Sequence, residues 1–297
     1  MLAIVIPYFK ISFFKETLQS LENQTNKNFK VYIGDDNSPN TPDDLLFNTK
    51  WNFNFEYKKF DNNLGSKSLV QQWNRCLAMV ENQDWVMILG DDDVLEKNVV
   101  KEFYINLTQI NNCSTVVRFS TQKINSEGNN ISEIYKHPVI EKSTDFLFKN
   151  SRSSLSEYIF NRKILFDIGF KDFPLAWHSD NLAVLEFSRF ENIYTINDEV
   201  IKIRISDESI SGTTTNMSKK FEATFQFYFY LSYSKRNYFT VNQKTILLDR
   251  LTKAYINKKK NVLNFLKITF IHLRFYSISK YLVFIRMVLK NIFNKCA

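Results

Sequence analysis

The sequence predicts an α/β protein with a mainly parallel sheet flanked by helices, followed by a helical and basic C-terminal extension. Two observations carry this prediction: short apolar runs typical of buried strands alternate with segments of helical spacing, and the chain from residue 221 onward is helical in pattern and rich in aromatics. Strands that alternate with helices indicate right-handed βαβ units. We therefore expect an α/β domain over 1–217 and a helical region over 218–297.

The expected elements follow one another along the chain. Strands are expected at 2–7, 29–34, 55–60, 85–90 and 114–124, and helices at 12–25, 68–81, 98–110 and 178–190. Between 152 and 170 a strand precedes a short helix, and 192–206 is expected to form strands around a turn. Residues 125–150 are polar and poorly patterned, with a turn at SEGNN.

The net charge of +8 belongs to the end of the chain. Residues 250–297 hold 11 Lys and Arg and no acid, so the first 249 residues carry 28 basic and 31 acidic side chains. The body thus lacks the basic face that nucleic acid binding requires, and we expect no nucleic acid partner. Three scattered cysteines fit a reducing compartment. Without a recognisable signal peptide or an uncharged apolar run of spanning length, we expect a cytoplasmic protein.

Acidic or turn-forming residues follow three of the predicted strands: PYF (7–9), DDNS (35–38) and GDDD (90–93). Open α/β sheets bind ligands outside the carboxyl ends of their strands, so these segments are expected at one edge. Three adjacent carboxylates repel one another, and this repulsion is tolerable in open solvent or where a cation lies among them. Hard divalent cations prefer oxygen ligands and substrate phosphates. Together the segments predict a pocket for a nucleoside diphosphate and a metal.

Each of these features also has a simpler structural explanation. An Asp pair after a strand is commonly a turn former, and Asp92 or Asp93 would interact favourably with the dipole of the following helix. Asp180, in WHSDNLAVLEF, is either a helix N-cap or a general base. Arg204 either neutralises a phosphate or lies on a strand edge. The chain has no glycine-rich motif of a Rossmann dinucleotide site or a P-loop.

Taken in order, the motifs resemble those of a family 2 glycosyltransferase of the Rossmann-like GT-A fold. The resemblance runs from about Leu2 to Gly212 and is carried by IVIPYF, FKVYIGDDNSP, NNLG, WNRCLA and WVMILGDDDVL. It implies a metal-dependent hexosyltransferase that moves a sugar, with inversion, from a nucleoside-diphosphate sugar such as a UDP-sugar. The implied acceptor is a hydroxyl of a glycan or lipid-linked saccharide in cell-surface polysaccharide synthesis, and the implied metal is Mg²⁺ or Mn²⁺. The transferred sugar is left open.

The resemblance also implies a role for each candidate site residue. Asp91 and Asp93 are the outer acids of a DXD motif, with Asp91 on the ribose and Asp93 on the metal, while Asp92 competes as metal ligand. Asp180 takes the place of the catalytic base. The remaining donor-binding candidates are Pro7, Tyr8 and Phe9 in the base and ribose pocket, Asp35 and Asp36 at the turn and the base, and Arg204 at the phosphates.

The basic tail, 250–297, has two interpretations. It either forms a helical pair packed on the protein or lies as an interfacial helix on anionic lipid, which predicts a peripheral protein on the inner face of the plasma membrane. Two alternative functions stay open beside transfer. One is a sugar nucleotidyltransferase, although IPYFKISFF lacks a Gly-rich phosphate loop; the other is an inactive nucleotide-sugar-binding or membrane-docking protein.

Overall fold

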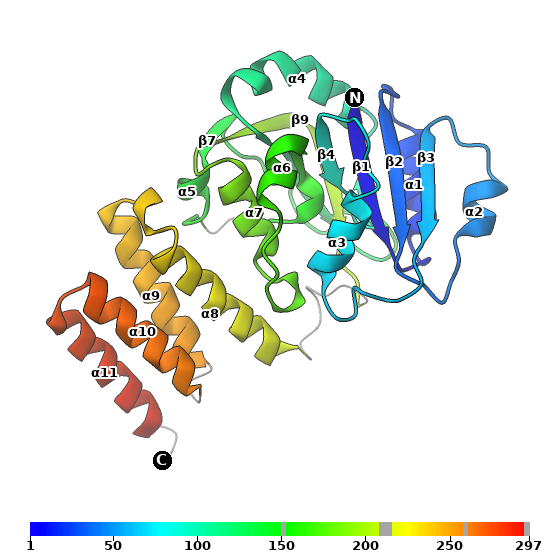
Figure 1. The fold of residues 1–297 in the computed structure, drawn as a ribbon. Helices are drawn as coiled ribbons and strands as arrows, with labels where there is room; N and C mark the ends of the chain where they lie inside the picture. Colours follow the sequence, from blue (N-terminus) through cyan, green and yellow to red (C-terminus); the bar gives the residue numbers. More distant parts are fainter. Residues whose placement is uncertain (150–152, 208–215, 258–260, 294–297) are drawn as a thin grey trace. The chain divides into compact units, whose positions relative to one another are not determined.

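A computed structural model describes residues 1–149, 153–207, 216–257 and 261–293. The chain divides into two compact units. Unit 1 comprises Met1–Asp172 and Ser179–Thr213, and unit 2 comprises Phe173–His178 and Thr214–Ala297. Figure 1 shows the elements of both units in the order of the chain.

Unit 1 is built on one mixed sheet with the strand order β3-β2-β1-β4-β8-β6-β9-β5, in which β7 also pairs with β9. Among the described residues, β5, β7 and β8 run antiparallel to their neighbours, and the other six strands share one direction. The predicted α/β class with a mainly parallel sheet is therefore confirmed. The strands are β1 Leu2–Tyr8, β2 Phe29–Asp35, β3 Asn54–Lys59, β4 Trp85–Ile88, β5 Val94–Leu95, β6 Val116–Ile124, β7 Ile140–Lys142, β8 Tyr158–Asn161 and β9 Asn192–Arg204.

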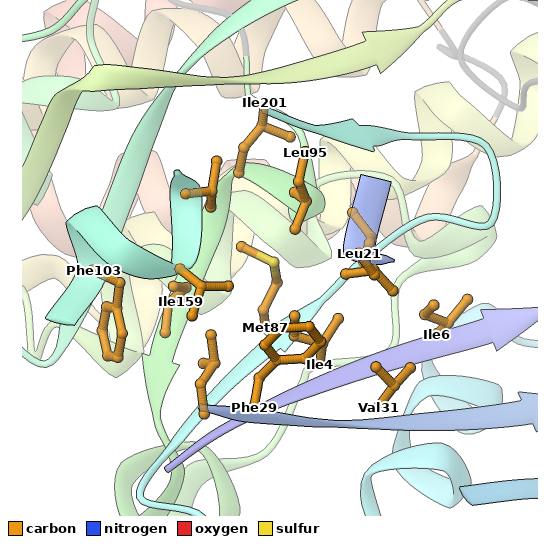
Figure 2. Packing of buried hydrophobic residues seen from close by; sticks show 14 of the residues in the cluster. Ile4, Ile6, Leu21, Phe29, Val31, Met87, Leu95, Phe103, Ile159 and Ile201 are labelled. Carbon is orange, nitrogen blue, oxygen red and sulfur yellow. The ribbon is translucent and has the colours of Figure 1, made fainter. Parts of the chain in front are cut away.

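Helices cover this sheet, and the main hydrophobic core lies beneath α1 and α4. In Figure 2, Leu21 of α1 and Phe103 of α4 lie with Ile4, Met87 and Ile159 from three neighbouring strands. Burial of such side chains supplies most of the driving force for folding. The helices of unit 1 are α1 Phe14–Glu22, α2 Asp43–Phe47, α3 Leu69–Leu77, α4 Val99–Cys113, α5 Ser143–Phe146, α6 Arg162–Ile168 and α7 Ser179–Phe187, and a 3₁₀ turn, η1, spans Leu155–Glu157.

The parallel register brings the ends of β1, β2 and β4 to the same edge of the sheet. Tyr8 at the end of β1 pairs with Asp35 at the end of β2. Val5 pairs with Ile88 at the end of β4, and its carbonyl accepts the N–H of Leu89 at 2.9 Å. The three acidic or turn-forming segments therefore leave the sheet side by side, as ligand-binding edges of α/β sheets do.

The strand over 192–204 differs from the expectation. Residues 192–204 form the single strand β9, whose register against β6 shifts between Phe119 and Ser120, and not two strands around a turn. Asn197 holds this irregularity, because its side chain accepts from the Ser120 hydroxyl and donates to the carbonyl of His137, both at 2.8 Å. The turn-forming residues thus bulge out of a strand that continues, as β-bulges do.

Unit 2 is helical, as predicted for the C-terminal region. It contains α8 Met217–Tyr233, α9 Val241–Asn257, α10 Val262–Phe275 and α11 Ile278–Phe293, coloured yellow to red in Figure 1. Phe225, Leu251, Ile271 and Phe284, one from each helix, are buried in a shared core. None of the helices in the described part of the chain combines the length and the apolar character needed to cross a membrane.

Candidate functional site

The end of β1 connects the two acidic segments. The carbonyl of Tyr8 accepts the N–H of Asp36 at 3.0 Å, and the next residue, Phe9, donates its N–H to the carboxylate of Asp91 at 2.8 Å. The Phe9 carbonyl also accepts the hydroxyl of Ser38 at 2.6 Å. The segments 7–9, 35–38 and 90–93 therefore form one connected group, as the order of strands and acids predicted.

Within 7–9, the side chains divide between core and surface. Tyr8 is buried, its ring centroid lies 4.6 Å from that of Phe14, and its hydroxyl donates to the carbonyl of Asn40 at 2.6 Å. Burial raises the pKa of Tyr8 to about 12, so its phenol stays protonated. Pro7 and Phe9 are partly exposed. The side chains of Pro7 and Phe9 are thus accessible to a ligand, and Tyr8 fixes the loop behind them.

Asp91 holds the backbone that follows β1 with one of its two oxygens. Its Oδ2 accepts the N–H groups of Phe9 and Lys10, both at 2.8 Å. Its Oδ1 accepts no hydrogen bond from the described residues, and the side chain is partly exposed. Burial and then the neighbouring charge of Asp92 raise the pKa of Asp91 to about 6, against the effect of the two amides. Asp91 therefore retains an acceptor atom for a ligand hydroxyl.

Asp93 points inward. Its carboxylate is buried, with Oδ1 accepting the N–H of Arg204 at 2.9 Å and Oδ2 accepting the hydroxyl of Ser156. The same hydroxyl accepts the N–H of Gly90 at 3.0 Å. A Cβ on Gly90 would lie 3.0 Å from carboxylate oxygens of both Asp92 and Asp93, so glycine lets the acids fold back over the backbone.

Residues 90–93, which we call the acidic loop, offer oxygen ligands of the kind that Mg²⁺ and Mn²⁺ prefer. Asp91 and Asp92 are partly exposed and close enough for their like charges to interact, which a cation between them would relieve. Asp93 fits a metal less well, because both of its oxygens already accept hydrogen bonds from the protein. Within the described residues, no group of three or more His, Cys, Asp or Glu side chains is arranged to hold a metal ion.

Arg204, at the end of β9, is hydrogen-bonded to the acidic loop. Its guanidinium is fully buried, donates from Nε to the carbonyl of Asp92 at 3.0 Å and from an Nη to that of Asn125 at 2.8 Å, and pairs with Glu16. It also lies 4.4 Å from the ring centroid of Phe13. Arg204 thus acts as an anchor in this arrangement, and its predicted phosphate contact stays a prediction.

Asp35 shapes the turn after β2. It is fully buried, and its Oδ1 accepts the N–H of Ser38, three residues further on, at 2.7 Å, which closes the turn. Its Oδ2 accepts the hydroxyl of Tyr57 at 2.7 Å. Both burial and the Asp35 carboxylate raise the pKa of that tyrosine above its usual value. The predicted turn-shaping role of Asp35 agrees with these contacts.

Asp36 organises the NNLG segment. Its Oδ1 accepts the N–H of Leu64 at 2.7 Å, its Oδ2 that of Gly65 at 2.9 Å, and Arg75 pairs with the carboxylate. A Cβ on Gly65 would lie 2.5 Å from Oδ2, so only glycine allows this approach. Burial still raises the pKa of Asp36, against these favourable partners. The predicted contact of Asp36 with a nucleobase stays a prediction.

Arg75 is a site residue that the sequence did not reveal. It belongs to WNRCLA, but nothing local in that helix shows that its guanidinium reaches Asp36 and packs 4.1 Å from the ring centroid of Phe60. Its other amino group donates to the side chain of Asn62 at 2.8 Å. Arg75 therefore links Asn62, the first residue of NNLG, to Asp36 just after β2, while Asp36 itself holds Leu64 and Gly65.

Asp180 lies in the first turn of α7. The side chain is partly exposed and accepts from the side-chain amide of Asn181 at 3.1 Å, and the Ser153 hydroxyl lies near enough to lower the pKa of the carboxyl. Burial by its surroundings raises the pKa of Asp180, and these contacts oppose the shift. A carboxylate with a raised pKa is a stronger base than an ordinary one, which suits proton removal from a hydroxyl.

One turn lies near both Asp180 and the acidic loop. The Ser156 hydroxyl donates to Asp93, and the hydroxyl of Ser153, three residues earlier, lies 3.0 Å from that of Tyr158 and near enough to Asp180 to lower its pKa. Because a chain spans at most roughly 3.6 Å per residue, these two serines lie within about 11 Å of each other. The acids that follow β4 and the acid of α7 therefore border the same region of unit 1.

The comparisons agree with this architecture. The model of glycosyl transferase family 2 matches residues 3–171. Among solved structures, S. aureus TarS 1–349 in complex with UDP-GlcNAc is similar at a TM-score of 0.62 and 13% identity, covering 91% of this chain and 79% of that one. The UDP complex gives a TM-score of 0.55 and 15% identity, covering 99% and 91%. These identities show the fold alone, and they confirm the predicted GT-A fold. A search of curated proteins found no match.

Proposed function

The chain belongs to glycosyl transferase family 2, and on this premise we propose that it moves a sugar from a UDP-sugar to a hydroxyl group, with inversion at the anomeric carbon. The acceptor is a glycan or a lipid-linked saccharide in cell-surface polysaccharide synthesis. The choice of donor is supported by the similar fold of S. aureus TarS, which was solved with UDP-GlcNAc and with UDP. Which sugar is transferred depends on loop contacts that we leave open.

The observation that carries this proposal is the short turn that holds Ser156 on Asp93 and sets Ser153 near Asp180. It sets a partly exposed base of raised pKa beside the edge where strand ends present an accessible acceptor atom of Asp91. A base near a donor-binding edge is the arrangement that direct displacement at a sugar requires.

The donor's nucleotide lies along the end of β1 in this proposal. Pro7 and Phe9 line the base and ribose, with Tyr8, Asp35 and Asp36 fixing the loops that enclose them. Asp91 Oδ1 accepts a ribose hydroxyl. The residues assigned to direct contact, Pro7, Phe9 and Asp91, are partly exposed. The others are buried and hold the neighbouring loops through hydrogen bonds. Preorganised loops reduce the entropy lost on binding.

Transfer then needs a base and a leaving group. Asp180 takes the proton of the acceptor hydroxyl while that oxygen attacks the anomeric carbon from the face opposite the diphosphate. The bond from the anomeric carbon to the phosphate oxygen breaks, and its electron pair stays on the departing UDP. Asp91 and Asp92 offer ligands to Mg²⁺ or Mn²⁺, which when bound would offset the charge of that diphosphate. Asp93 accepts hydrogen bonds from Ser156 and Arg204 and so holds the loop that carries Asp91 and Asp92.

We further propose a cytoplasmic protein that is peripheral on the inner face of the plasma membrane, where a lipid-linked acceptor would be presented. This part is supported by the basic residues of 250–297, which attract an anionic surface. It is independent of the chemistry assigned to Asp180.

Replacing Asp180 by Asn tests the catalytic assignment. Donor binding should persist, while transfer should fall on the order of 10²–10⁴-fold, because the amide cannot accept the proton. UDP release would be measured across a panel of UDP-sugars, with calorimetry for donor affinity. Asp167→Asn, an exposed acid of α6, is the matched control and should behave as the wild type.

The outcomes separate the alternatives. Transfer at the wild-type rate by Asp180→Asn would remove the base assignment. Donor binding without turnover by the wild type would favour the inactive binding protein, and pyrophosphate release from a nucleoside triphosphate and a sugar phosphate would favour a nucleotidyltransferase.

A further inference from the structure

Two helices of unit 2 expose large aliphatic side chains. On α10, Leu263, Leu266 and Leu273 are between 57% and 67% exposed, and on α11, Ile278, Leu282 and Val283 are between 51% and 70% exposed. We call these six residues the aliphatic face. Several large aliphatic side chains exposed on two helices that contact each other exceed the singly scattered apolar residues of an ordinary surface, and such concentrations mark interaction sites. The aliphatic face is therefore a candidate binding surface.

The inward sides of the same helices are already packed. Ile268 and Ile271 of α10 and Phe284 and Val288 of α11 are buried in the core of unit 2. The ring of Phe284 stacks on that of His272, with centroids 4.9 Å apart. Each helix thus has one apolar side that folding uses and a second that folding leaves at the surface, so the exposed side is not required for the fold.

Basic side chains are interleaved with the aliphatic face. Lys267 and Arg274 lie exposed on α10, and Lys280 and Arg286 lie exposed on α11. From residue 214 to 297 the sequence holds 16 Lys and Arg against two acids, Glu222 and Asp249. A partner of this surface must accept aliphatic side chains and also supply negative charge.

We propose that α10 and α11 lie in the interface of an anionic lipid bilayer, with the aliphatic face in the acyl region and the interleaved cations at the lipid phosphates. An anionic lipid surface offers both environments within the width of one helix: acyl chains for the aliphatic side chains and phosphates for the cations. Long Lys and Arg side chains keep their charge at the headgroups while their stems lie against apolar surface.

Two other occupants fit the surface less well. A second copy of the chain would bring the same excess of positive charge against itself, and protein interfaces are depleted of lysine. A nucleic acid would meet the cations but would leave Leu and Val side chains against phosphates, where aromatic stacking partners are the common choice. The charge and the aliphatic character together favour lipid.

This inference deepens the membrane part of the proposed function by assigning it to defined residues. It does not depend on the transfer chemistry, since vesicle binding is measured without a donor. Asp180→Asn should bind vesicles as the wild type does, so a failure of either proposal is visible by itself.

Co-sedimentation of the full chain with vesicles tests the inference. Vesicles of phosphatidylcholine alone are compared with vesicles that contain phosphatidylcholine and phosphatidylglycerol in about equal parts. The wild type should pellet with the anionic vesicles only. Leu266→Asp with Leu282→Asp, and separately Lys267→Glu with Arg286→Glu, should each weaken this binding by about tenfold or more. Ile105→Asp, at a 61% exposed position of α4 in unit 1, is the matched control and should change nothing.

Each variant should remain folded, because all of the changed side chains are exposed, and circular dichroism checks this. Equal binding to neutral and anionic vesicles, or unchanged binding by both double variants, would overturn the proposal. Light scattering tests the remaining occupant. If the wild type does not bind vesicles but forms a dimer, and the Leu266→Asp, Leu282→Asp variant is a monomer, the surface binds a second copy of the chain and the proposal is overturned.

Discussion

Asp36 and Asp91 both follow strands of the same sheet edge, and both are linked to the end of β1, yet their carboxylates are used differently. Asp36 engages both oxygens: Oδ1 accepts from Leu64 and Arg75, and Oδ2 accepts from Gly65. Asp91 engages only Oδ2, which accepts two backbone amides. Both oxygens of the first carboxylate accept hydrogen bonds from the protein, whereas one oxygen of the second accepts none from the described residues.

This difference separates two roles that look alike in the sequence. A carboxylate whose oxygens all face donors stabilises a loop, and changing either oxygen to an N–H₂ group sets donor against donor. A carboxylate with one oxygen unused holds its loop and can still accept a hydrogen bond from a ligand. Substitution by Asn distinguishes the roles, since it keeps the shape and converts one acceptor into a donor.

Asp36→Asn should give the largest loss of stability in this comparison. The new amide must face Leu64, Gly65 or Arg75, all of which are donors, and Arg75 loses its counter-charge. Burial raises the pKa of Asp36, so removing its charge relieves some desolvation, but setting an amide against three donors costs more. We expect the free energy of unfolding to fall by about 3 kcal/mol, measured by urea denaturation at pH 7. Asp61→Asn, at an exposed position nearby, is the matched control. A variant as stable as the control would mean that Asp36 does not hold the NNLG loop.

The sequence was informative wherever the signal is local. Alternating apolar runs revealed the βαβ units, and the acids that follow β2 and β4 lie at the edge predicted for them because parallel strands share their ends. Partners brought together by folding were not visible. Arg75 lies 39 residues from Asp36, and Ser156 lies 63 residues from Asp93. Hydrophobic periodicity along the sequence does not indicate contacts between residues so far apart.

Arg204 shows the same limit for burial. In an alternating strand, an arginine near the end reads as an edge residue. Its guanidinium is buried because Glu16, 188 residues away, and carbonyls at positions 92 and 125 accept its donors. A charge can be buried when every donor finds an acceptor, and that condition is a property of the fold.

Ser156→Ala tests whether the buried acid of the acidic loop resembles Asp36. Its hydroxyl donates to Asp93 and accepts from Gly90, so alanine leaves a buried carboxylate oxygen and a backbone N–H without this partner. We expect a loss of about 2 kcal/mol in the free energy of unfolding. Ser66→Ala, an exposed serine, is the control. Equal stability of the two variants would show that Ser156 does not secure Asp93.

Asp91→Asn should have the smallest effect and the opposite sign. The pKa of Asp91 is raised from 3.8 to about 6 by burial and by Asp92, so its protonated form favours the folded state. A carboxyl whose folded pKa exceeds its unfolded value loses stability as the pH rises from about 4 to about 6, and the loss persists above that. Asn abolishes the charge, and its one carbonyl oxygen can still accept both amides.

Asp91→Asn should therefore be more stable than the wild type at pH 7 by about 1 to 2 kcal/mol, after allowance for solvent screening of a partly exposed group. The two proteins should be equally stable near pH 4, so the difference in urea midpoint, followed from pH 4 to 8, should grow mainly below about pH 6. A donor titration should show weaker UDP-sugar binding by the same variant. If Asp91→Asn is instead destabilised as Asp36→Asn is, both oxygens of Asp91 serve the fold, and the distinction between the two acids does not hold.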